Sequence, residues 1–132
     1  MIMSTAFDIF EALKCSVEID SKGTKTWRDA NGQLHREGGP AIEGPEGSVW
    51  YFHGQLHREG GPAIERANGD QTWWLHGQLH RENGPAIEWR SVDGRLEWWL
   101  HGQRHREGGP AVELEDGSCE RWVRGKWIRP DK

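Results

Sequence analysis

The chain has 132 residues, of which 29% are charged and 34% hydrophobic, and its formal net charge at pH 7 is −4. This length suits a single domain, and the negative charge argues against a long nucleic acid or an anionic membrane surface as partner. Because we find no apolar run of membrane-spanning length, no secretion signal and only two cysteines, we expect a soluble, cytoplasmic protein with reduced thiols.

The first predicted element is a short amphipathic helix within residues 1–15. A Ser-Thr pair can cap it, and Phe7, Phe10 and Leu13 recur at helical spacing. We expect this helix to cover the first edge of the sheet that follows, or one of its faces, because open sheet edges invite aggregation.

The rest of the chain repeats one unit. The string HREGGPAIE occupies residues 35–43 and returns, nearly unchanged, three more times. Degenerate half-units are expected at both ends of a stacked array, because a terminal unit lacks one neighbour. We therefore predict an N-terminal cap and a repeat array over 16–132, with units at 31–52, 53–75, 76–100 and 101–123 and half-units at 16–30 and 124–130.

Each unit carries two turn signals and one corner. A His-Gly or Asn-Gly pair follows the aromatic residues and suits a two-residue hairpin turn. A second glycine turn follows the Ala-Ile-Glu segment, and a Gly-Pro pair interrupts the chain where a central strand could not continue. The predicted fold is all-β: a repetitive antiparallel hairpin meander that forms an elongated, twisted sheet.

Pairing across the turn at His53-Gly54 predicts which residues share a face. Tyr51 would lie opposite Leu56, and Val49 opposite Arg58. One aromatic column would then share a face with the strand histidines, and a second column would share the opposite face with the arginines. The two columns are Trp50, Trp73 and Trp98, and Tyr51, Trp74, Trp99 and Trp122. One column either becomes a core as the sheet coils or stays exposed as an interaction surface.

The repeated pattern W-[YW]-x-H-G-x-x-H-R-x-x-G-P-A, in units of about 23 residues, resembles the MORN-repeat proteins over roughly residues 17–130. It is closest to the MORN-like variants of phage and bacterial open reading frames. The resemblance implies β-hairpins aligned in a long sheet that serves as a binding or scaffolding surface. Some bacterial relatives look like antitoxins, and phage relatives lie among small anti-defence proteins, which would act in the host cytoplasm.

The sequence offers little support for a metal site or an enzyme. His-x-x-x-His recurs, as at His53 and His57, but a glycine turn separates the two rings, and Ile128 replaces the strand histidine in the last copy. We expect these histidines to pack beside tryptophan. A catalytic set should occur once, whereas His-Arg-Glu is copied four times. We predict no metal, no cofactor and no enzymatic activity.

The arginine is present in every copy, at Arg36, Arg58, Arg81, Arg106 and Arg129. Its stem can pack on a tryptophan while its head meets the glutamate that follows in the motif. Alternatively, the five guanidinium groups form a row that binds phosphates or the carboxylates of a partner.

From these patterns we predict a non-catalytic protein-binding module that inhibits a host defence protein or a toxin. An exposed aromatic and arginine surface would carry the binding, because such residues dominate interface energetics. Two alternatives are sequestration of an anionic small molecule, such as a nucleotide signal, and structural self-assembly; open sheet ends also suggest a homodimer. The predicted surface consists of Tyr51, Trp74, Trp99, Trp122, Arg58, Arg81 and Arg106.

Overall fold

The computed structural model describes residues 16–130, so the helix predicted within residues 1–15 lies outside the described part. Residues 16–130 form seventeen short β-strands and no helix, which confirms the all-β prediction. This part of the chain accordingly holds no helix that could cross a membrane.

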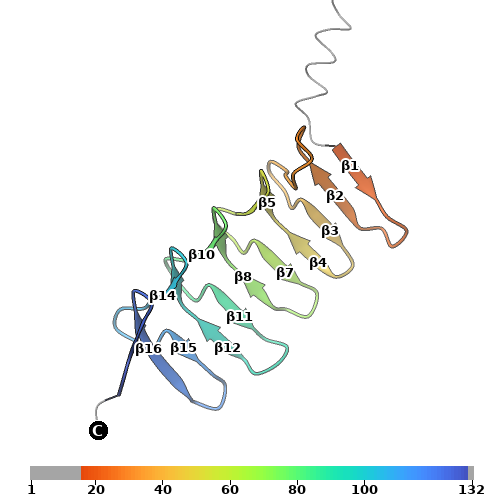
Figure 1. The fold of residues 1–132 in the computed structure, drawn as a ribbon. Coiled ribbons are helices and arrows are strands. Elements are labelled where there is room, and N and C mark those ends of the chain that lie inside the picture. Colours follow the sequence, from red (N-terminus) through yellow and green to blue (C-terminus); the bar gives the residue numbers. More distant parts are fainter. Residues whose placement is uncertain (1–15, 131–132) are drawn as a thin grey trace, which may run out of the picture.

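Most strands belong to one antiparallel sheet in the order β1-β2-β3-β4-β7-β8-β11-β12-β15-β16-β17, here called the main sheet (Figure 1). Its strands are β1 (Ser16–Ile19), β2 (Lys25–Arg28), β3 (Ile42–Gly44), β4 (Gly47–Val49), β7 (Ile64–Arg66), β8 (Gln71–Thr72), β11 (Ile87–Trp89), β12 (Arg95–Glu97), β15 (Val112–Glu113), β16 (Cys119–Val123) and β17 (Lys126–Ile128). Three short hairpins stand along one side of it: β5 (Tyr51–Phe52) with β6 (Gln55–Leu56), β9 (Trp74–Leu75) with β10 (Gln78–Leu79), and β13 (Trp99–Leu100) with β14 (Gln103–Arg104).

Every unit follows the same path through these two layers. Strand β4 continues past Trp50 into β5, turns back as β6 and passes through the Gly-Pro corner into β7, which pairs with β4. The proline has no N–H to donate, so the chain leaves the ladder there and re-enters it at Ala63, whose carbonyl accepts the Trp50 N–H. The meander therefore advances by two strands of the main sheet per unit.

The turn of each short hairpin has the geometry that the sequence predicts. His53 and Gly54 both have positive φ, 47° and 82°, as a type I′ turn requires, and Tyr51 lies opposite Leu56. The Asn31-Gly32 turn is different. The Asp29 N–H bonds the Gln33 carbonyl and only Gly32 has positive φ, so this loop is longer than the predicted two residues.

Cross-strand pairing gives the main sheet two distinct faces, because directly paired residues point to the same side. We call the first the aliphatic face; its row contains Thr26, Ile42, Val49, Ile64, Thr72, Ile87, Glu97, Val112 and Glu120. We call the second the arginine face; its row contains Glu43, Ser48, Glu65, Gln71, Glu88, Leu96 and Glu113. The apolar core between the layers is a thin line through the array, formed by Ala41, Ala63, Ala86, Ile87, Ala111 and Val112.

One predicted pairing is wrong. Val49 pairs with Ile42 and Ile64, not with Arg58. After His57 the chain leaves its own hairpin, and the Arg58 N–H donates to the carbonyl of Trp74 in the following short hairpin, β9–β10. The predicted register puts the arginines on the same face as Tyr51 and Trp74. In the structure they lie on the opposite face.

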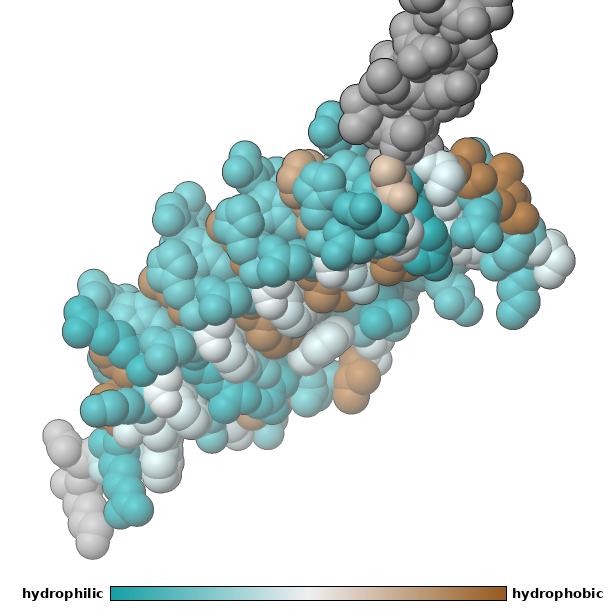
Figure 2. Space-filling view, turned by 45° about the horizontal axis from the view of Figure 1, so that its top comes forward, coloured by the Kyte–Doolittle hydropathy of each residue, from teal (hydrophilic) through white to brown (hydrophobic). Residues whose placement is uncertain are grey.

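Hydrophilic ridges succeed one another along the array in the space-filling view, with apolar side chains in the furrows between them (Figure 2). Larger apolar side chains are exposed at both ends of the described chain. Val17 and Ile19 of β1 are 50% and 64% exposed, and Trp127 of β17 is 48% exposed. Both terminal strands therefore leave apolar side chains open to solvent.

Candidate functional site

Four of the repeated arginines place their guanidinium over an indole ring. In each case the guanidinium carbon is 3.8–4.0 Å from the ring centre of a tryptophan eight or nine residues earlier. The Nη1 group also donates to the carbonyl of the proline four residues later, at 3.0–3.3 Å. The stacked pairs are Arg36 on Trp27, Arg58 on Trp50, Arg81 on Trp73 and Arg106 on Trp98.

The carboxylate partner of the arginine is not the one predicted. Arg58 pairs with Glu65 at 3.0 Å and Arg106 with Glu113 at 2.9 Å, through strand residues on the arginine face. Arg81 lies 3.5 Å from Glu88 in the same way. The glutamate inside the His-Arg-Glu motif points to solvent instead. Thus the predicted packing on tryptophan is confirmed, and the predicted ion pair is wrong.

The second glycine of each Gly-Gly-Pro or Asn-Gly-Pro corner makes room for this stack. A Cβ on Gly61 would lie 2.8 Å from the guanidinium carbon of Arg58, and one on Gly84 would lie 2.9 Å from that of Arg81. Real Cβ atoms do not approach other atoms so closely, so any side chain here would displace the guanidinium from its indole. The arginine, the tryptophan, the glycine and the proline carbonyl form one clamp.

Two neighbouring hollows open between the His-Arg-Glu loops on the arginine face; we call them the inter-loop hollows. The first has a volume of about 450 Å³ and the second about 690 Å³. Trp73 and Leu75 line the first, Trp98 and Leu100 the second, while Glu82 and Asn83 line both. Each hollow therefore has an aromatic and aliphatic lining and a charged rim.

The free charge at these hollows is negative. Arg58 and Arg106 are each paired with one strand glutamate, and Arg81 shares Glu88 with Arg90. The motif glutamates stay exposed, with Glu82 76% and Glu107 81% accessible. Their nearest basic neighbours are the rings of His80 and His105, at 3.8 Å. Each unit thus adds one uncompensated carboxylate to the rim.

The predicted aromatic column lies on the other face. Tyr51, Trp74, Trp99 and Trp122 are half-buried there, and the indole N–H of each tryptophan is bonded two residues back, to Thr72, Glu97 or Glu120. Trp74, Leu79, Ile64 and Ile87 line an apolar hollow of about 120 Å³. The structure therefore separates the predicted surface into an aromatic half and an arginine half on opposite faces.

Glu97 is the most heavily bonded residue of the aliphatic face. It is 4% exposed and accepts bonds from the Arg95 and Arg104 side chains at 2.6 and 2.9 Å, and from the Trp99 indole at 3.0 Å. Burial raises the pKa of this carboxyl, but the two guanidiniums and the indole outweigh burial and hold the pKa below its ordinary value. This group is ionised and structural.

The four histidines of the His-Arg-Glu motifs, here called the motif histidines, lie just outside the hairpin strands and join consecutive units. The Nδ1 atom of each accepts the backbone N–H of the first turn residue in the next unit, at 2.9–3.0 Å; the pairs are His35–His53, His57–His76, His80–His101 and His105–Arg124. Burial, reinforced by the neighbouring tip histidine, lowers the pKa of His35, His57 and His80. Sequence reasoning missed this role. The signal was Ile128, which replaces the histidine in the last copy: within the described residues no further turn follows that copy, so no acceptor is needed there.

Asp29, His35 and His53 place three potential metal-ligand atoms within 4.8 Å of one another. The two rings, however, stack with centres 3.9 Å apart, and the Nδ1 atom of His35 accepts the His53 N–H. Asp29 bonds the His53 ring at 2.9 Å and also accepts the Asn31 and Gln33 N–H groups. These bonds fasten the first turn to the second and account for the cluster without a metal.

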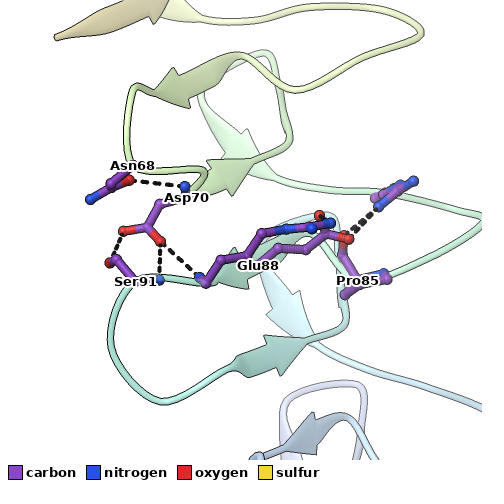
Figure 3. A network of polar contacts seen from close by, with 7 residues as sticks. Asn68, Asp70, Pro85, Glu88 and Ser91 are labelled. Atoms are coloured by element: carbon purple, nitrogen blue, oxygen red, sulfur yellow. Dashed lines mark hydrogen bonds and ion pairs between the residues drawn. The ribbon is translucent and has the colours of Figure 1, made fainter.

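The turns that join β3 to β4, β7 to β8, β11 to β12 and β15 to β16 are here called the far turns. At these turns, Asp70 performs a similar connecting role (Figure 3). Its carboxylate accepts the Arg90 and Ser91 N–H groups and the Ser91 hydroxyl at 2.8–2.9 Å. Burial raises its pKa, but these bonds outweigh burial and keep the pKa below its ordinary value. Pro85 and Glu88, which hold the Arg81 guanidinium, lie in the same view.

Comparisons with protein-family models, with curated proteins and with solved structures find no match to this chain. The resemblance of its repeat to MORN-like units accordingly stays a prediction, with which a long antiparallel strand meander is compatible.

Proposed function

We propose that this chain is a non-catalytic module that binds another protein through the inter-loop hollows of the arginine face. The observation that carries the proposal is the recurrence of one hollow at consecutive unit junctions, each lined by tryptophan, leucine, arginine and glutamate. Recesses lined by tryptophan and arginine are where interface energy concentrates, because such residues bury large area around directional polar groups.

The proposed surface keeps one half of the surface predicted from the sequence. Arg58, Arg81 and Arg106 belong to it, held in place by the stacks and ion pairs described above. The column of Tyr51, Trp74, Trp99 and Trp122 lies on the opposite face, where its three tryptophans bond residues of the aliphatic row. The arginines act here as walls that shape the hollows, since the Nη1 group of each is held by a proline carbonyl.

The mode of action that we propose is inhibition by occupancy: the module covers a functional surface of a toxin or host defence protein. Such a role needs no catalytic group. It also agrees with the state of the His-Arg-Glu motif, in which the His Nδ1 atom is bonded to the next turn and the guanidinium is held by a proline carbonyl. These groups hold the array together and do not form a nucleophile with its base.

The two alternative functions make different demands. Sequestration of an anionic molecule would have to compete with Glu65, Glu88 and Glu113 for the positive charge of the guanidiniums. Self-assembly, including a homodimer, would use the exposed apolar ends of the described chain, where Ile19 is 64% accessible. Sedimentation velocity at two concentrations tests self-assembly separately from partner binding.

A position-specific crosslink tests the proposal. A photo-reactive phenylalanine analogue at Asn83, which lines both hollows, should give one protein adduct of defined mass in a lysate of the source cells. The control position is Val92, which is 84% exposed in a far turn. Unlabelled protein should compete the adduct away. Adducts of equal yield from both positions, or none from Asn83, would overturn the proposal.

A further inference from the structure

We infer that the partner presents an extended, basic segment in the polyproline II conformation, with a cationic side chain at every third residue. This inference rests on the proposed function and names the chemistry of the partner. It is carried by the period of the array, the lining of the inter-loop hollows and the charge of their rims.

The period of the array matches this conformation. Each unit contributes two strands to the main sheet, and neighbouring strands lie about 4.8 Å apart, so equivalent positions recur about every 9.6 Å. A polyproline II helix has three residues per turn and rises about 3.1 Å per residue, so equivalent side chains recur about every 9.3 Å. An extended β-strand presents the same side about every 6.7 Å, and an α-helix has a pitch of about 5.4 Å. Neither coincides with successive hollows in a single step.

The lining of the hollows fits proline rings. Trp73 with Leu75, and Trp98 with Leu100, supply an aromatic and an aliphatic group at equivalent places in consecutive hollows. Grooves lined by aromatic residues bind proline-rich segments well, because such segments are already extended and lose little entropy on binding. An open hollow of about 450 Å³ also has room for more than one side chain.

The negative charge of the hollow rims favours basic side chains at those ligand positions that do not enter the hollows. Glu59, Glu82 and Glu107 occupy equivalent positions in three consecutive loops and are all exposed. The arginines beside them are already paired with strand glutamates, so they do not neutralise this row. A lysine or arginine at every third position would meet one carboxylate per unit. The described surface thus complements a basic ligand in both charge and spacing.

Synthetic peptides test the inference directly. We expect (Lys-Pro-Pro)5 to bind in isothermal titration calorimetry and to change the tryptophan fluorescence. The acidic peptide (Glu-Pro-Pro)5 should not bind. The peptides (Lys-Pro-Pro-Pro)4, which alters the spacing, and (Lys-Gly-Gly)5, which lacks the conformation, should bind at least about tenfold more weakly, because each loses one matched property.

Matched variants place the peptide on the protein. Glu82→Gln should raise the Kd of (Lys-Pro-Pro)5 about three- to fivefold, as expected for an exposed ion pair, and the triple change at Glu59, Glu82 and Glu107 should raise it further. Glu46→Gln, at an exposed position in a far turn, should leave the Kd unchanged. Urea unfolding confirms that each variant is folded.

Equal affinity for the two lysine-proline spacings, or an unchanged Kd for Glu82→Gln, would overturn the inference. If the Asn83 crosslink succeeds while (Lys-Pro-Pro)5 fails to bind, only the inferred partner chemistry is wrong. If the Asn83 crosslink fails, the proposed binding surface is wrong whatever the peptide does.

Discussion

The ring of His80 must stay neutral to accept the hydrogen bond that joins its unit to the next one. Its Nδ1 atom accepts the His101 N–H, and a proton on that nitrogen would remove the acceptor. Burial and the nearby His101 ring lower the pKa of His80, while Glu82 opposes them. The same residue type therefore connects every pair of full units and makes that connection sensitive to acid.

We expect stability to fall as the pH drops below about 6.5, the ordinary pKa of histidine. The pKa values of His35, His57 and His80 are lower in the folded than in the unfolded state, so the unfolded chain binds more protons in this range. Their contribution is complete above about pH 6.5 and is lost as the pH falls through the folded-state pKa values. Urea midpoints at pH 7.5, 6.5 and 5.5 measure this slope.

The His80→Asn variant gives the control for this prediction. An asparagine oxygen can replace Nδ1 as acceptor without titrating, so the slope should decrease. Gln78→Asn, in the adjoining strand, should keep the full slope. An unchanged slope in His80→Asn would contradict the assignment. Glu97, whose folded-state pKa is lowered, loses its contribution only at more acidic pH, below the usual range of a free glutamate.

At the scale of the strand, each aromatic residue of the column Tyr51, Trp74, Trp99 and Trp122 is preceded, two places earlier, by a residue that suits its hydrogen-bonding needs. Trp74, Trp99 and Trp122 each find an acceptor there, whereas Tyr51, which has no indole N–H, follows Val49. The chain thus contains two self-consistent pairs at equivalent positions of its units, threonine or glutamate with tryptophan, and valine with tyrosine.

This observation predicts a thermodynamic coupling. Thr72→Val leaves the Trp74 indole N–H without a partner and should cost about 1 kcal/mol of unfolding free energy. Adding Trp74→Tyr reproduces the Val49–Tyr51 pair, so the double variant should be at least about 0.5 kcal/mol more stable than the sum of the single changes predicts. Equilibrium urea unfolding of the four proteins completes the cycle. Strict additivity would count against the proposed matching.

Local signals explain which elements the sequence could predict. The hairpin at His53-Gly54 follows from a turn of two residues and the alternation around it, and the structure confirms it. The path after His57 could not be predicted in this way, because the Arg58 N–H bonds a carbonyl of the next short hairpin. The arginine was consequently placed on the wrong face and given the wrong carboxylate. Contacts between units are set by stacking, which pairing within one hairpin does not reveal.

At the scale of the molecule, each unit of the described chain pairs its strands with those of its neighbours in sequence, so stability should be close to a sum of unit and junction contributions. Deleting residues 76–100 joins Leu75 to His101 and restores a His-Gly turn in register. The His101 N–H can then bond His57, as the His76 N–H does in the full chain. The shortened protein should fold, with a urea m-value lower by about a fifth.

Deleting only residues 76–87 provides the matched control. It removes about half a unit and shifts turns and strands out of phase, so we expect loss of the cooperative transition in urea unfolding followed by circular dichroism. If the two deletions behave alike, the unit boundaries that we assign are wrong.

The bond between a histidine of the His-Arg-Glu motif and the next turn has a direction: the acceptor always lies in the earlier unit and the donor in the later one. Synthesis on the ribosome proceeds in the same direction. Each new hairpin that leaves the ribosome therefore meets the edge of the preceding unit. That edge already presents the histidine Nδ1 acceptor and the arginine that lies over a tryptophan. The array is suited to folding during synthesis, in which each unit adds to the C-terminal end of the units already folded.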